Sequence, residues 1–154
     1  MTTTNNSSID RLPPQNLEAE TALLGCLMLD KDAIIKVADQ LIPDDFYDYR
    51  HRVIYEAVLE LFTRNVSIDV LTVANGIEEK KLTDKVGGSS YLATLVNSVP
   101  SAAHATYYAS IVRKKGTLRR LIQSASEITN LAFTEEGEIE TILDNAEQKL
   151  FNIS

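Results

Sequence analysis

The residues of this 154-residue chain that could do chemistry are few and lie far apart in sequence. Neither of the two histidines, His51 and His104, has a second histidine or a cysteine at the spacing that metal ligands need. The single cysteine, Cys26, lies inside the apolar run 23–29, where burial raises a thiol's pKa and keeps it unreactive. We therefore expect no metal site, and we interpret each histidine as a surface residue or as a hydrogen-bonded residue near a helix end.

The sequence also lacks the usual motif of a nucleotide-binding site. A phosphate-binding loop needs a Gly-Lys-Ser/Thr step, and the sequence contains no Gly-Lys pair. The nearest string, at 115–117, has the order Lys-Gly-Thr and lies within a helical pattern. The acidic pairs at 44–45 and 135–136 stand at expected helix starts, where they offset the helix dipole. The sequence thus predicts neither a catalytic residue nor a bound cofactor.

Five cations gather within eight residues and could contact a nucleic acid. They are Arg113, Lys114, Lys115, Arg119 and Arg120. The whole chain carries a net charge of −7, whereas domains that grip a polyphosphate backbone are usually basic. We interpret the cluster as a solvated helix face, and a nucleic-acid-binding module that uses it stays as the alternative function.

The spacing of apolar residues predicts the elements that carry these side chains. Apolar residues recur at three- and four-residue steps along nearly the whole chain, and alternating strand patterns are scarce, which predicts an all-α fold. The longest apolar run has seven residues, too short for a membrane-spanning helix. The expected N-terminal caps of the helices are Asn16, Asp32, Asp44 or Asp48, Asp69, Ser89 or Ser90, and Thr134.

Three regions follow from these patterns. Residues 1–12 have the composition of a disordered tail, and residues 13–104 form a compact helical head that the Gly87-Gly88 pair interrupts. Residues 105–154 form an antiparallel helical hairpin, whose first arm has about 28 residues and ends at Phe133. The second arm carries a long apolar seam that a two-helix unit cannot hide by itself, which predicts self-association. The residues of this hairpin seam are Ile139, Leu143, Ala146 and Leu150.

Particular residues point to a known family. The segment 13–20, Pro-Pro-Gln-Asn-Leu-Glu-Ala-Glu, followed by Leu24-Gly25 and Leu29-Asp30, resembles the opening of DnaB-type replicative DNA helicases. The similarity holds in order and spacing over about residues 12–153 and identifies the family's amino-terminal domain. The further similar motifs are Asp45-Phe46-Tyr47 with His51-Arg52, Ile68-Asp69 with Leu71-Thr72, Gly87-Gly88 with Tyr91-Leu92, Val99-Pro100-Ser101-Ala102-Ala103, and Tyr108-Ala109 with Ile111-Val112-Arg113, Arg119 and Leu121-Ile122.

This resemblance implies a fragment of a larger cytoplasmic protein. In the family, the head and hairpin form a collar on a hexameric ring of RecA-like motor domains. ATP, Mg and most contact with DNA belong to the motor, so the resemblance implies that this chain is non-catalytic and holds no cofactor. Collar domains of the family pair through their hairpins into a trimer of dimers and receive the helicase-binding domain of primase. A helicase loader is a further candidate partner.

Three positions are similar to primase-contacting positions of the family: Tyr91, just after the double glycine, and Ile122 and Ile128 on the first hairpin arm. Packing in a core is the alternative role for each. Residues six apart on a helix differ by about 240° of rotation. We therefore expect Ile122 and Ile128 not to share one narrow seam, and at least one to face away from the second arm.

Overall fold

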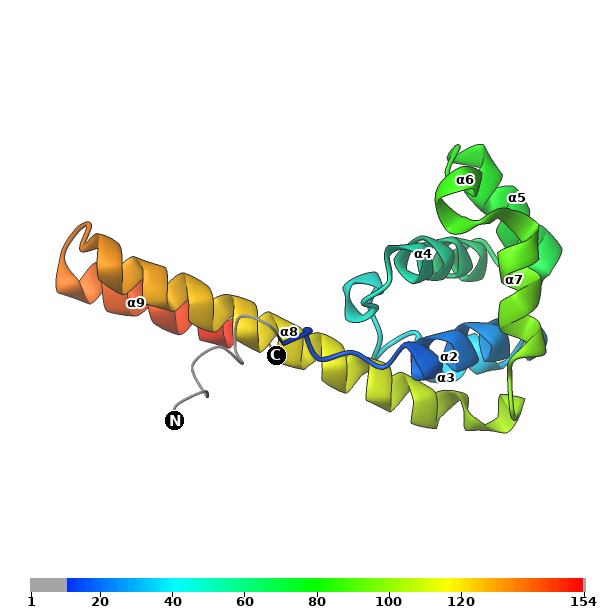
Figure 1. Cartoon of the computed structure of the whole chain (residues 1–154), viewed down its shortest axis with the longest axis horizontal. Helices are drawn as coiled ribbons and strands as arrows, with labels where there is room; N and C mark the ends of the chain where they lie inside the picture. Colours follow the sequence, from blue (N-terminus) through cyan, green and yellow to red (C-terminus); the bar gives the residue numbers. More distant parts are fainter. Residues whose placement is uncertain (1–10, 154) are drawn as a thin grey trace. The chain divides into compact units, whose positions relative to one another are not determined.

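The computed structural model describes residues 11–153, and these residues form helices and no strand, as predicted (Figure 1). The expected tail 1–12 falls mostly outside the described residues. The elements are α2 (Leu17–Leu29), α3 (Ala33–Val37), η2 (Pro43–Asp45), α4 (Tyr49–Thr63), α5 (Val70–Glu79), α6 (Thr83–Val86), α7 (Gly88–Asn97), η3 (Ala102–His104), α8 (Ala105–Thr134) and α9 (Ile139–Phe151).

Side-chain caps fix three of the helix starts where the sequence predicts them. The Asn16 side chain accepts a hydrogen bond from the Ala19 amide at 3.0 Å, and Asp48 caps α4. Asp69 and Thr72 form a reciprocal capping box at the start of α5, which confirms Asp69 as the cap of this helix. Asp32 makes no such side-chain bond, and α3 has only 5 residues.

The core of the head is built around α2. Leu23, Leu24 and Leu27 are fully buried, and α2 packs against both α4 and α7. Helices approach closely where side chains are small, and Gly25 lies at such a point: a Cβ placed there would sit 2.5 Å from the Leu95 carbonyl oxygen of α7. The head therefore depends on a glycine inside a helix, a position that otherwise costs stability.

The compact units of the structure divide inside α8. Residues 16–116 form one unit, and residues 117–154, together with the segment before 16, form the other. The boundary lies later than the 104/105 position expected from sequence, because Ala105, Ala109 and Val112 of α8 are buried in the core of the head. The first turns of this helix thus belong to the head and its later turns to the hairpin.

Two turns differ from the sequence prediction. Gly87 and Gly88 both have positive φ, which confirms the break there, but α7 begins at Gly88 without a cap from Ser89 or Ser90, and a short helix, α6, precedes it. The predicted Thr134 cap is wrong. Thr134 is the last residue of α8, and the chain turns through Glu135 and Gly137, both at positive φ, before α9 begins at Ile139.

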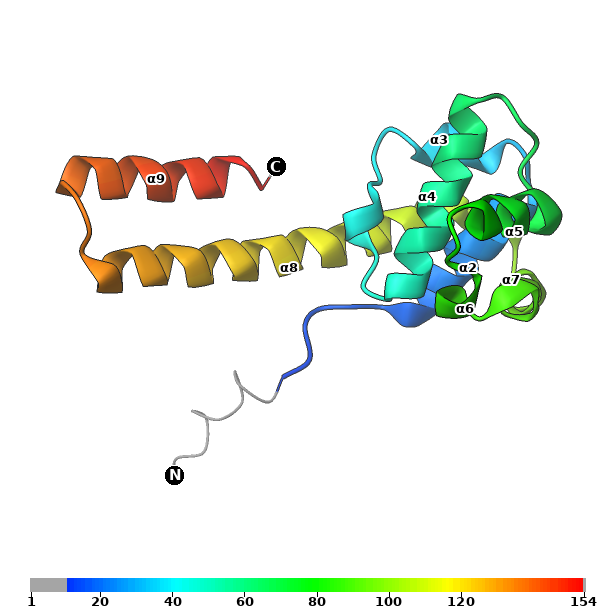
Figure 2. The same cartoon turned by 90° about the horizontal axis from the view of Figure 1, so that it is seen from above.

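The two arms of the hairpin run antiparallel, as predicted, with α9 alongside the later turns of α8 (Figure 2). No residue of α9 is buried. The hairpin therefore has no closed core of its own, and its apolar side chains stay in contact with solvent. None of the helices among the described residues is long and apolar enough to cross a membrane.

Candidate interaction surfaces

A buried polar chain runs through the head and ends at Tyr91. Glu20 on α2 and His51 on α4 are each 1% exposed, and a Glu20 carboxylate oxygen lies 2.7 Å from His51 Nδ1. The other ring nitrogen, Nε2, lies 2.6 Å from the Tyr91 hydroxyl oxygen. The Glu20 carboxylate also accepts the amides of Tyr47 and Asp48, at 2.7 and 3.3 Å. The Glu20–His51–Tyr91 cluster is thus fully hydrogen-bonded, as buried polar groups must be.

An ion pair covers the Tyr91 ring. The Arg50 guanidinium lies 4.1 Å from the ring centroid, a cation–π contact, and donates to the Asp48 carboxylate at 2.8 Å. Burial works to raise the pKa of Asp48, but the hydrogen bonds from Arg50 outweigh it and the pKa lies below its usual value. Burial raises the pKa of the Tyr91 phenol despite the nearby Arg50 cation, so the hydroxyl keeps its hydrogen. Tyr91 is therefore a half-buried, well-anchored residue.

Sequence reasoning did not predict this cluster. Glu20 lies in the first turn of α2, where the helix dipole alone explains an acidic residue, and His51 is hydrogen-bonded near a helix start, the second of its two expected roles. A signal did exist. Glu20 shares a face of α2 with Leu24 and Leu27 at steps of four and seven residues, so a carboxylate on that face must be buried and needs donors.

The two isoleucines of the first hairpin arm face different surroundings, as the helical geometry predicts. Ile122 is 55% exposed. Ile128 is half-buried and lines a cavity of about 400 Å³ between the arms, together with Ile142 and Leu143 of α9. Ile122 is thus available for contact with a partner, whereas Ile128 is partly covered within the hairpin.

The hairpin seam remains largely open to solvent. Ile139, Leu143 and Leu150 are 59, 54 and 50% exposed, and Ala146 is half-buried. All four fall within one helical face of α9, because they are spaced by four, three and four residues. Isolated exposed apolar residues are ordinary, but a continuous row on one face marks an interaction site.

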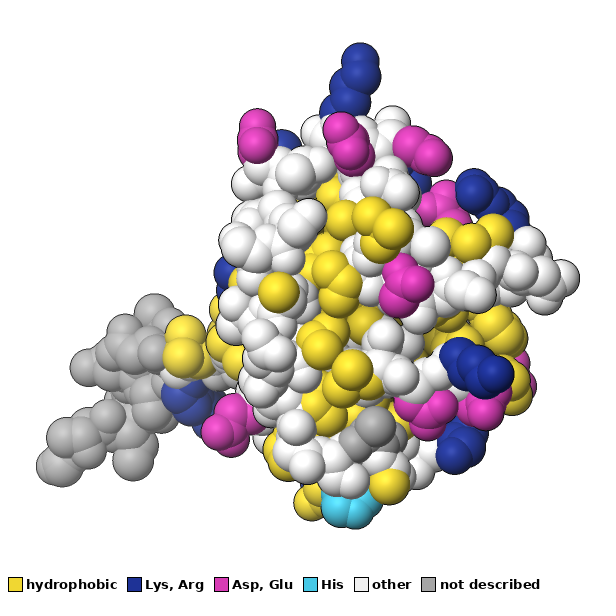
Figure 3. All heavy atoms as spheres, turned by 90° about the vertical axis from the view of Figure 1, so that its right-hand side faces the viewer, with side chains coloured by type: hydrophobic (Ala, Val, Ile, Leu, Met, Phe, Trp, Pro, Cys, Tyr) yellow, Lys and Arg dark blue, Asp and Glu magenta, His cyan; other side chains and the backbone are white. Residues whose placement is uncertain are grey.

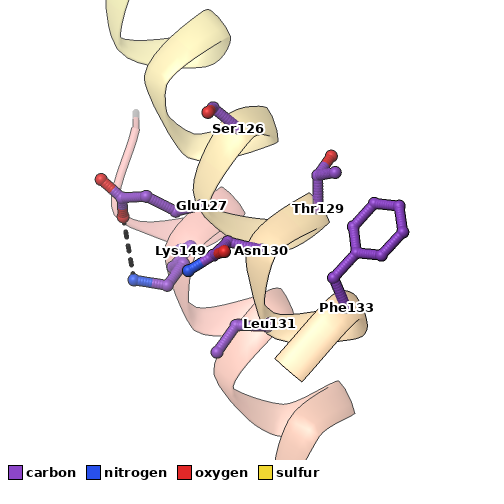
Figure 4. Close-up of a pocket in the computed structure, with 7 residues that line it drawn as sticks. All are labelled: Ser126, Glu127, Thr129, Asn130, Leu131, Phe133 and Lys149. Atoms are coloured by element: carbon purple, nitrogen blue, oxygen red, sulfur yellow. Dashed lines mark hydrogen bonds and ion pairs between the residues drawn. The ribbon is translucent and has the colours of Figure 1, made fainter. Parts of the chain in front are cut away.

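A second hollow, of about 520 Å³, is lined by residues within 126–133 of α8 and by Lys149 of α9 (Figure 4). Phe133 on its rim is 81% exposed and points away from α9, whereas Glu127 reaches across to Lys149 of α9 at 2.9 Å. Hydrogen bonds from Lys149 and Gln123 hold the pKa of Glu127 below its usual range. This exposed ion pair joins the two arms, and such pairs contribute little free energy.

The basic cluster is not a single face. Successive residues of a helix are 100° apart, so Arg113, Lys114 and Lys115 point in three different directions around α8. Arg119 donates to the Pro14 carbonyl at 2.8 Å, and Arg120 donates to the Thr117 hydroxyl at 3.4 Å. The five cations therefore do not line up as one stripe that could follow a phosphate backbone.

Of the remaining residues whose side chains could do chemistry, Cys26 is buried and His104 is exposed. Cys26 is fully buried, as predicted, and burial, with a smaller effect of Asp30, raises its pKa. His104 is exposed beside Tyr108. Within residues 11–153, no three His, Cys, Asp or Glu side chains lie together in a way that could hold a metal ion.

The end of the head that carries α5 and α7 offers another apolar surface. Hydrophobic side chains gather along the middle of this face, and most of the charged side chains lie around its edge (Figure 3). Among the exposed large apolar residues of the head is Leu71 of α5, at 69%. The head thus has an apolar surface that is separate in sequence from the hairpin seam.

The described residues define an all-α protein, with a helical head and a helical hairpin that has an open apolar seam. A family model described as the DnaB-like helicase N terminal domain matches residues 12–114. The chain belongs to this family, which confirms the resemblance found in the sequence.

Two curated relatives support the assignment. Replicative DNA helicase DnaC of Bacillus subtilis (strain 168) is 45% identical over 145 residues, and replicative DNA helicase DnaB of Geobacillus stearothermophilus is 41% identical over the same length. Each match covers 94% of this chain and 32% of the relative. The chain thus corresponds to the N-terminal domain of a replicative helicase and spans about a third of the length of these relatives.

Solved structures agree with the fold. The crystal structure of the N-terminal domain of DnaB helicase from Mycobacterium tuberculosis matches with a TM-score of 0.87 and 38% identity, over 93% of this chain and 100% of that one. A DnaB-like replicative helicase, solved to describe its interactions with primase, matches with a TM-score of 0.75 and 24% identity, over 90% of this chain and 32% of that one. At that identity the second match shows the fold alone.

Proposed function

We propose that this chain is the assembly and primase-docking collar of a bacterial replicative helicase that acts in the cytoplasm. Its hairpin pairs with a second copy, as part of a hexamer in the full-length protein, and its exposed side chains receive the helicase-binding domain of primase. A loader protein is a further candidate partner. ATP and Mg would bind to the motor domain, which also makes most of the contact with DNA.

The open hairpin seam is the observation that carries the proposal. The seam side chains are about half exposed, and the cavity beside them has an apolar lining of Ile128, Ile142 and Leu143. Burial of apolar surface is the main driving force for association, at about 25 cal/mol per Å². A second hairpin offers the same apolar row, so a two-fold pairing would cover both seams at once.

Two measurements on one sample separate this function from nucleic-acid binding. We expect sedimentation equilibrium to show self-association that changes little between low and high salt, because apolar burial drives it. Titration of a fluorescent single-stranded DNA should show only weak binding. Tight DNA binding whose affinity falls steeply with salt, by a monomeric chain, would instead favour the basic cluster as a phosphate-binding surface.

Primase docking leads to a second expected result. Truncation of Tyr91 or Ile122 to alanine should weaken binding of the primase domain by about tenfold to a hundredfold, because a buried anchor contributes about 1.5–3 kcal/mol. Ile128→Ala should act mainly through the stability of the hairpin, because Ile128 lines its interior. Isothermal titration calorimetry with the cognate primase domain measures the dissociation constants.

The chain offers matched controls for these truncations. Ile35 on α3 is 62% exposed, close to the 55% of Ile122, and Tyr107 is an exposed tyrosine at the start of α8. Ile35→Ala and Tyr107→Ala should bind primase as wild type does. If Tyr91→Ala and Ile122→Ala bind as tightly as these controls, primase docks elsewhere and only the assembly role stands.

A further inference from the structure

The Tyr91 hydroxyl is already occupied inside the head. Its oxygen lies 2.6 Å from His51 Nε2, and the other ring nitrogen of His51 contacts the Glu20 carboxylate. An ionised carboxylate only accepts hydrogen bonds, so Nδ1 carries a hydrogen and the orientation of the imidazole ring is set by Glu20. The hydroxyl is therefore held by the protein interior, and a docking partner meets mainly the ring of Tyr91.

Neighbouring side chains hold the Tyr91 ring in place. The His51 and Tyr91 rings lie nearly parallel, with centroids 5.9 Å apart and planes 8° from parallel, and the hydrogen bond joins them end to end. The Arg50 guanidinium lies against the Tyr91 ring, and Asp48 holds that guanidinium through three hydrogen bonds to its Nε and Nη2 atoms. Helices α2 and α4 thus both contribute groups that hold one side chain of α7.

We propose that Glu20 and His51 are positioning residues that hold Tyr91 in a single rotamer for the docking of primase. The inference rests on the proposed docking role of Tyr91. A side chain that is ordered before binding loses less entropy on binding, so preorganisation of an anchor raises affinity without any new contact. Removal of the buried link therefore weakens docking even though His51, at 1% exposure, cannot reach a partner.

The test removes the hydrogen bond between His51 and Tyr91 in two ways, once by a change at each partner. His51→Asn shortens the side chain so that it no longer reaches the Tyr91 hydroxyl, and Tyr91→Phe removes the hydroxyl but keeps the ring. Each change should weaken primase binding about threefold to tenfold, the range for loss of one hydrogen bond. The double variant should bind no more weakly than the weaker single variant, because both changes break one interaction. His104→Asn, at the exposed histidine, is the matched control and should bind as wild type does.

A second readout separates positioning from plain loss of stability. Three-bond couplings measured by NMR should report one χ1 rotamer for Tyr91 in the wild-type chain and in His104→Asn, and averaged rotamers in His51→Asn and Tyr91→Phe. If His51→Asn fails to fold, Tyr91→Phe carries the test alone, since it leaves Glu20 and His51 paired. Unchanged couplings together with unchanged affinity would overturn the inference.

The experiments distinguish failure of the positioning inference from failure of the proposed docking role of Tyr91. If Tyr91→Ala binds primase as wild type does, the docking role of Tyr91 is lost and the positioning inference is lost with it. If Tyr91→Ala and Tyr91→Phe weaken binding but a folded His51→Asn does not, the hydroxyl contacts primase directly. In that case only the positioning inference is overturned.

Discussion

Gly25→Ala is expected to lower the stability of the head by about 2–3 kcal/mol, the upper range for overpacking of a core. A Cβ at this position would lie 2.1 Å from Val99 Cγ2 and 2.5 Å from the Leu95 carbonyl oxygen. The second contact is with backbone, which cannot rotate away, so α2 and α7 must separate. We expect thermal unfolding, followed by circular dichroism, to show a midpoint lower by about 10 °C or more.

Gly76→Ala is the matched control. Gly76 also lies inside a helix, α5, but a Cβ there would have only one neighbour, the Ala57 Cβ at 3.9 Å, which is ordinary contact. Alanine favours the helix by about 0.5–1 kcal/mol over glycine, so this change should raise the midpoint slightly. Equal effects of the two changes would show that close packing of α2 on α7 does not determine the stability of the head.

Leu143→Asp is expected to weaken self-association by about a hundredfold or more. In the proposed dimer this side chain is covered by the second hairpin, and an ionised carboxylate buried there without a partner costs several kcal/mol, at 1.4 kcal/mol for each factor of ten. In the single chain Leu143 is 54% exposed, so the carboxylate can stay hydrated and the helices should persist. Sedimentation equilibrium measures the dissociation constant, and circular dichroism checks the helix content.

Ile35→Asp is the control for this change. Ile35 is 62% exposed on α3, outside the hairpin, so the variant has the same change of charge without touching the seam. It should self-associate as the wild-type chain does. A Leu143→Asp chain that keeps its helix content and its wild-type dissociation constant would remove the seam from the interface.

The sequence predicts the helices of this fold well because their signals are local. The spacing of apolar residues and the caps Asn16, Asp48 and Asp69 depend on a few neighbours along the chain, and the structure places these helices within a residue or two of their expected starts. The sequence signal that sets the hairpin turn is less local. Thr134 has the right type for a cap, but Gly137 three residues later adopts φ 96° and moves the start of α9 beyond the acidic pair.

The candidate site is predictable only in part, because its key contacts join distant segments. The partners Glu20, His51 and Tyr91 are 31 and 40 residues apart in sequence, and local patterns explain each of them separately. Helical rotation alone does predict that Ile122 and Ile128 face different surroundings. It does not say which of the two lines the cavity, since that depends on the position of α9.

The single cysteine gives the head a built-in probe of its own opening. Cys26 lies in the C-terminal half of α2, fully buried, with its Sγ 3.5 Å from the Ser101 carbonyl oxygen. A thiol reagent reaches it only when the head opens, so the rate of modification reports the opening free energy where closing is faster than reaction. Because the chain has no other thiol, exchange of this one group with a chromogenic disulfide would follow the head of the intact chain without any engineered label.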